Sequence, residues 1–178
     1  MAKTNLRNFT VQEKLNKMDL DVITVTTESN VDVDASGEIA IKPLEIPNAV
    51  AVPGGTALLQ TCLVYNPTGN DQPLDIYISD TNQGFTNTNV GGSETIASAN
   101  LDARGTTATI LNGVQAIFNS GTGNAVGTGD TISFVSSIGA PVKAAAGSTS
   151  LFLWAVASTT ATSPGSVNFT IKLGLVKD

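Results

Sequence analysis

Alternation of apolar and polar positions runs through most of the chain after residue 45 and predicts β-strands. In residues 166–176, "SVNFTIKLGLV", every second position from Val167 to Leu175 is apolar, and most positions between them are polar. Such a strand presents one face to a core and the other to solvent. Residues 74–79, "LDIYIS", alternate in the same way. Both stretches are predicted to be half-exposed strands.

Two other stretches, residues 56–65 ("TALLQTCLVY") and 150–158 ("SLFLWAVAS"), are apolar on both faces. Simple alternation divides the apolar residues of the first stretch between its faces, with Leu59, Leu63 and Tyr65 on one and Leu58, Cys62 and Val64 on the other. Strands of this kind are typical of the centre of a sheet. Together they carry more apolar surface than one sandwich interior needs, so we expect the excess to be buried between subunits or under another part of the chain.

Shorter strand-like stretches complete the pattern, at residues 22–27, 38–41, 106–111, 114–118 and 131–136. Turn-forming residues separate them, as in "NPTGNDQP" between the strands predicted on either side. No helical period of useful length follows residue 18, so parallel strands with helical crossovers are not expected. The sequence therefore predicts an all-β fold, an antiparallel β-sandwich with a jelly-roll-like body.

Charge divides the chain near residue 45. Residues 1–18 are basic and residues 19–45 are acidic, whereas charges are sparse from residue 46 onward. A change of composition of this kind is a boundary signal. We predict an arm over residues 1–45, extended except for a short helix at its start, and a β-sandwich body over residues 46–178.

The start of the arm has the pattern of a short amphipathic helix. Thr10 and Glu13 have the spacing of a capping box, and Val11, Leu15 and Met18 lie at i, i+4 and i+7 on one apolar face. So short a helix needs a surface to pack against. That surface could belong to its own domain or to a neighbouring protein, and the three apolar residues are the candidate partner-binding residues.

Length, composition and charge exclude several classes of function. With 178 residues the chain has the size of one domain, and its net charge of −6 gives no electrostatic footprint for nucleic acid. No apolar run is long enough for a signal peptide core or a membrane span. We therefore expect a protein that is made in the cytosol and binds neither nucleic acid nor membranes.

Candidate chemistry is sparse. The chain contains no His, which removes the usual partner of a Ser or Cys nucleophile and the commonest metal ligand. Cys62 lies in an apolar stretch without a basic neighbour, where a thiol packs as a small hydrophobic group, and Trp154 is likewise expected to fill the core. We predict no catalytic residue and no cofactor, and hence a protein that is not an enzyme.

The pattern nearest to a metal site is "DVDASGE" at residues 32–38. Asp32, Asp34, Ser36 and Gly37 match the first half of a calcium-binding loop, but Pro43 stands where the bidentate Glu is required. An acidic turn is the favoured interpretation, so we predict no metal. The glycine-rich residues 121–130 lack the Lys and Ser/Thr of a phosphate-binding loop and are predicted to be a turn.

Three stretches resemble a known family: "ALLQTCLVYNPTGNDQPLDIYISDTN", "SETIASANLDARGTTATILNGVQAI" and "VKAAAGSTSLFLWAVASTTATSPGSVNFTIKLGLVKD". In strand order and turn placement, roughly residues 50–178 are similar to small virion proteins of tailed bacteriophages, of the head decoration or cement type. The resemblance implies a jelly-roll-like sandwich without catalytic residues. It also implies a structural role on the outer surface of the capsid, where the protein would stabilise the head.

From this resemblance we expect the major capsid protein as partner, binding across its subunit joints, and location on the virion surface after synthesis in the host cytoplasm. We also expect self-association, with a homotrimer favoured over a dimer because an icosahedral lattice has threefold positions. One alternative is a tail or fibre accessory protein that binds host surface polysaccharide. A carboxylate-dependent glycan hydrolase is a weaker alternative, since no convincing site supports it.

Overall fold

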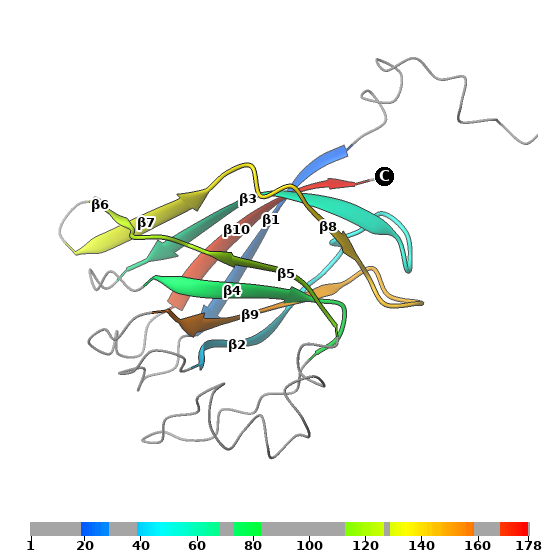
Figure 1. Cartoon of the computed structure of the whole chain (residues 1–178), viewed down its shortest axis with the longest axis horizontal. Helices are drawn as coiled ribbons and strands as arrows, with labels where there is room; N and C mark the ends of the chain where they lie inside the picture. Colours follow the sequence, from blue (N-terminus) through cyan, green and yellow to red (C-terminus); the bar gives the residue numbers. More distant parts are fainter. Residues whose placement is uncertain are drawn as a thin grey trace, which may run out of the picture.

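A computed structural model describes residues 19–28, 39–67, 73–82, 113–126, 129–158 and 168–177 (Figure 1). These residues form strands and no helix. The strands are β1 (Asp19–Glu28), β2 (Ile39–Ile46), β3 (Thr56–Asn66), β4 (Leu74–Ser79), β5 (Val114–Asn119), β6 (Asn124–Val126), β7 (Asp130–Val135), β8 (Ala140–Lys143), β9 (Leu151–Ala157) and β10 (Asn168–Lys177). A helix long and apolar enough to cross a membrane is not found in the described part of the chain.

The strands form two antiparallel sheets that pack face to face (Figure 1). The six-stranded sheet has the order β1-β10-β3-β7-β6, with β8 also paired to β3, and the four-stranded sheet has the order β2-β9-β4-β5. The pairing is nested: β1 pairs with β10, β2 with β9, β3 with β7 and β8, and β4 with β5. A long hairpin rolled up in this way has the strand order of a jelly roll, and the predicted all-β antiparallel sandwich is confirmed.

The structure differs from the predicted division at residue 45. β1 pairs with β10 along its whole length, from Asp19 opposite Lys177 to Glu28 opposite Asn168, and β2 pairs with β9. Residues 19–28 and 39–46 are thus strands of the two sheets. Both are edge strands, where acidic side chains are tolerated and discourage pairing with other chains. In the sequence, the acidic side chains of these two edge strands suggested a separate arm.

Several predictions fall on residues outside the described part of the chain. These are the helix with Val11, Leu15 and Met18, the acidic turn at residues 32–38 and the strand at 106–111. Two described strands, β6 and β8, were not predicted. β6 lies within the glycine-rich residues 121–130 and pairs with β7, so part of the predicted turn is one strand of a hairpin.

The core lies between the inner faces of the sheets. Its largest members are aliphatic and aromatic side chains that are almost fully buried, among them Ile41, Leu59, Ile76, Ile78, Leu153, Phe169 and Ile171. Burying such a side chain contributes about 1.5–3 kcal/mol. Cys62 is one of the core residues, 0% exposed, and burial raises the pKa of its thiol to about 12. Its predicted packing role is confirmed.

A β-bulge in β3 changes which side chains enter the core. The register with β10 passes from Thr61 opposite Gly174 to Leu59 opposite Leu175, so Gln60 is the extra residue. Leu59 consequently points inward like Cys62, and both are buried. The predicted grouping of Leu59 with Leu63 was wrong, because simple alternation does not hold across a bulge.

Candidate functional site: the outer faces of the sheets

Polar contacts among the described residues are structural pairs. Tyr65 Oη donates a hydrogen bond to Asp130 Oδ2 at 2.7 Å, and Asn119 Nδ2 donates to Asp75 Oδ1 at 2.7 Å. The carboxylate of Asp130 raises the pKa of Tyr65, which makes its hydroxyl a still weaker acid. The described residues contain no group of three or more His, Cys, Asp or Glu side chains placed to hold a metal ion.

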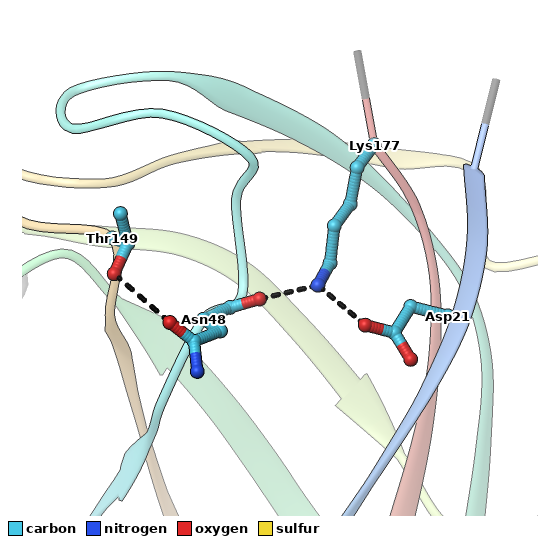
Figure 2. Close-up of polar contacts among 4 residues, drawn as sticks. All are labelled: Asp21, Asn48, Thr149 and Lys177. Atoms are coloured by element: carbon cyan, nitrogen blue, oxygen red, sulfur yellow. Dashed lines mark hydrogen bonds and ion pairs between the residues drawn. The ribbon is translucent and has the colours of Figure 1, made fainter. Parts of the chain in front are cut away.

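A buried lysine joins three segments at the end of the sandwich where the chain enters β1 (Figure 2). Lys177 Nζ donates to Asp21 Oδ2 at 2.6 Å and to the backbone carbonyl of Asn48, while Thr149 Oγ1 contacts Asn48 Oδ1 at 3.5 Å. The Lys177 side chain is 8% exposed and that of Asp21 is 47% exposed. The ammonium group lowers the pKa of Asp21 by hydrogen bonding and by charge. We name this contact the Lys177 clasp.

A second polar contact bridges the two sheets. The Gln115 side chain on β5 donates through Nε2 to the Lys143 carbonyl at 2.7 Å and accepts the Lys143 N–H through Oε1. β5 is an edge of the four-stranded sheet, whereas Lys143 belongs to β8 in the other sheet. One amide side chain thus satisfies both backbone groups of a residue in the opposite sheet. This contact is structural.

The outer face of the four-stranded sheet is buried at its centre. Trp154 and Val156 of β9 lie on the face opposite the core, yet they are 0% and 4% exposed. Tyr77 of β4 stacks on Trp154 with ring centroids 3.9 Å apart and planes inclined by 7°. Burial, and after it the charge of Asp75, raises the pKa of Tyr77. Trp154 is buried as predicted, but on the outer face.

The outer face of the six-stranded sheet carries an exposed apolar patch. Leu63 on β3 lies opposite Phe134 on β7, and Tyr65 lies opposite Ile132. Phe134 is 61% exposed, and the other three side chains are partly exposed. We call Leu63, Tyr65, Ile132 and Phe134 the apolar patch. Cross-strand neighbours of this kind form one continuous surface.

The polarity of β7 is inverted relative to an ordinary sandwich strand. Thr131 and Ser133 point toward the interior and are each 8% exposed, whereas Ile132 and Phe134 point outward. Alternation predicted this strand, but it does not tell which of the two faces is the inner one. The register with β3 decides that, since Ser133 lies opposite Val64 and Phe134 opposite Leu63, and such long-range pairing is not visible in the sequence.

Comparison with known proteins gives only distant similarities. No protein-family model matches the chain, and no curated protein matches it. Three virus structures are similar over 89–99% of the chain: tomato aspermy virus (8% identity, TM-score 0.34, 76% of that chain covered), Desmodium yellow mottle tymovirus (11%, 0.28, 87%) and Triatoma virus (9%, 0.33, 69%). Similarities this weak carry no argument about function.

Proposed function

We propose that this chain is a structural virion protein, and specifically a decoration or cement protein of a tailed bacteriophage. In this role it binds the outer surface of the capsid across the joints between major capsid protein subunits and stabilises the head. The observation that carries the proposal is the inverted polarity of β7, which presents Phe134 to solvent on a rigid sheet while Ser133 points inward. An exposed apolar patch on a folded sheet marks a surface that contacts another protein, which in the proposed assembly is a neighbouring copy of this chain.

The proposed assembly is a homotrimer. Three copies around a threefold position repeat the same contacts at each of the capsid joints that meet there, so the copies attach together rather than singly. Weak contacts with the capsid then add up to stable attachment. The jelly-roll strand order and the resemblance of roughly residues 50–178 to phage cement proteins support this assignment.

The alternative of a polysaccharide-binding tail or fibre protein has less support. Sugar rings stack on exposed aromatic side chains. Trp154 is fully buried and stacks on Tyr77, and Phe134 lies opposite Leu63, with the pair of Tyr65 and Ile132 beside them. Within the described part of the chain, the outer faces therefore favour a protein partner over a glycan.

The proposal is tested by adding the purified protein to phage heads that lack it. We expect saturable binding at a fixed ratio to the major capsid protein, and heads that survive to higher temperature. Removing residues 1–18 leaves every described strand intact, so the β-sheet signal in circular dichroism should be retained while attachment is lost. Retained attachment by this variant would place the docking surface on the sandwich. Binding to purified host polysaccharide or to tails, with none to heads, would contradict the proposed function.

A further inference from the structure

We infer that the apolar patch is the docking site for residues 10–18 of a second copy of this chain. The inference rests on the self-association proposed above, and it names the two surfaces that meet. On one side are Leu63, Tyr65, Ile132 and Phe134, and on the other is the apolar face formed by Val11, Leu15 and Met18.

The patch has the organisation of a protein interface rather than of an ordinary solvent-facing surface. Leu63 faces Phe134 and Tyr65 faces Ile132 across β3 and β7, which lie side by side in the sheet (Figure 1). The hydroxyl of Tyr65 is held by Asp130 at the rim of the patch, and this contact turns the ring's polar end away from the centre. The patch thus combines an apolar centre with a polar rim that includes Asp130 on β7 and Lys172, which lies opposite Leu63 on β10, as protein interfaces do.

The chain's own residues 10–18 are too close to the start of β1 to cover the patch. Along the strands, the patch at Leu63 is level with Thr24, five residues beyond Asp19 and so about 17 Å from it. Phe134 on β7 lies three strand spacings away from β1, about 14 Å. The straight distance from Asp19 to Phe134 is therefore about 22 Å, whereas a nine-residue helix is about 13 Å long.

The absence of a linker before β1 also keeps residues 10–18 away from the patch of their own subunit. Met18 immediately precedes Asp19, so no linker residue is available to reverse the chain over the outer face. In its own subunit, Leu15 lies only four residues from Asp19, so even a fully extended chain would carry it only about 14 Å away. The patch is therefore beyond the reach of Leu15 and Met18 within one subunit, and a neighbouring copy must supply them.

Charge favours the same pairing. Residues 1–18 hold four of the nine basic residues and one of the fifteen acidic residues, so they carry a net charge of +3 and the rest of the chain carries −9. Lys14 and Lys17 lie beside the apolar face of the predicted helix, and Asp130 lies at the rim of the patch. Opposite charges steer the segment toward another copy. Because the helix is too short to be stable alone, it folds as it docks.

This contact joins different surfaces of the two copies, so it is head-to-tail. A head-to-tail contact closes into a ring when its rotation allows, and a threefold ring uses every patch and every segment once. The trimer proposed above then needs no additional interface.

Intermolecular disulfide trapping tests the inference. One full-length chain carries Leu15→Cys and a second, distinguished by a tag, carries Phe134→Cys. Because the native Cys62 is fully buried, it does not compete for cross-linking. We expect a mixed dimer to accumulate under mild oxidation, because the disulfide traps a contact that the loss of the Phe134 ring weakens. The matched control replaces Phe134→Cys by Ile117→Cys, since Ile117 is 56% exposed on the outer face of the other sheet. The control should give at least tenfold less mixed dimer.

Equal cross-linking to positions 117 and 134 would overturn the inference. So would a chain carrying both Leu15→Cys and Phe134→Cys that forms only intrachain disulfides. Ile132→Cys serves as a second patch position should the Phe134 variant fold poorly. If the protein still binds heads and forms trimers while Leu15 does not cross-link to the patch, the proposed function stands and this inference fails.

Discussion

β3 and β9 are both apolar on two faces, but their outer faces differ. On β9, Trp154 and Val156 are buried within the single chain, and Tyr77 stacks on the indole ring. On β3, Leu63 and Tyr65 remain partly exposed and are extended by Phe134 of β7. A strand with two apolar faces is therefore not in itself a sign of an interface. Whether the second face is covered inside the subunit or left exposed depends on packing that the strand's own sequence does not show.

The largest expected effect is a loss of unfolding free energy when the packing on the outer face of β9 is removed. Trp154→Ala should lower the free energy of unfolding by about 3–5 kcal/mol, because it removes a fully buried aromatic side chain and leaves a cavity. Urea unfolding followed by circular dichroism measures this change. A loss below about 1 kcal/mol would show that the outer face of β9 is not packed as described.

Gly174 lies opposite Thr61 of β3, next to the bulge at Gln60. A Cβ at Gly174 would lie 2.3 Å from Thr61 Oγ1. Gly174→Ala should therefore cost about 1–3 kcal/mol of unfolding free energy. In a Thr61→Ala background the same substitution should cost much less, because the clashing hydroxyl is gone. An equal cost in both backgrounds, measured by urea unfolding, would locate the strain elsewhere.

The Lys177 clasp secures the end of the six-stranded sheet at which β1 begins and β10 ends. Lys177→Met should cost about 1.5 kcal/mol through the loss of its charged hydrogen bonds to Asp21 and Asn48. Because the folded-state pKa of Asp21 lies below its usual value, its contribution is complete above about pH 4 and is lost as the pH falls through the folded-state pKa.

Melting temperatures of the wild type and Asp21→Asn between neutral and strongly acidic pH test this dependence. The wild type should melt higher at neutral pH, and the two curves should converge in acid, where Asp21 is protonated and uncharged. Parallel curves over the whole range would show that Asp21 does not contribute through its charge.

The smallest expected effect on the fold belongs to the apolar patch. In a chain lacking residues 1–18, Phe134→Ser should change the free energy of unfolding by less than about 0.5 kcal/mol, since the ring is 61% exposed. Urea unfolding of the matched pair measures this difference. A loss comparable with that of Trp154→Ala would mean that Phe134 belongs to the subunit's own packing.

Alternation in the sequence predicted strands well where apolar residues recur regularly. Residues 166–176 predicted β10, and residues 74–79 predicted β4. β6 and β8 were missed because a three-residue strand within glycine-rich sequence and a four-residue strand containing Pro141 carry no clear period. The acidic edge strands β1 and β2 resembled an arm, because charge at a sheet edge looks the same in sequence as charge on an extension.

The apolar patch could not be predicted from the sequence for a different reason. The alternation in residues 131–136 defines two faces, but only pairing with β3 turns Phe134 outward and Ser133 inward. That pairing depends on long-range register, which alternation within a single strand does not show. By contrast, Cys62 could be assigned to the core from its apolar neighbours alone.

The most direct test of the account is the mass of the full-length protein in solution, because its central claim is that another copy covers the apolar patch. Light scattering at micromolar concentration should give a mass near three times 18.2 kDa for the wild type. Phe134→Ser should reduce this mass to that of one chain. A wild-type monomer at every concentration, or a trimer that persists in Phe134→Ser, would contradict the claim.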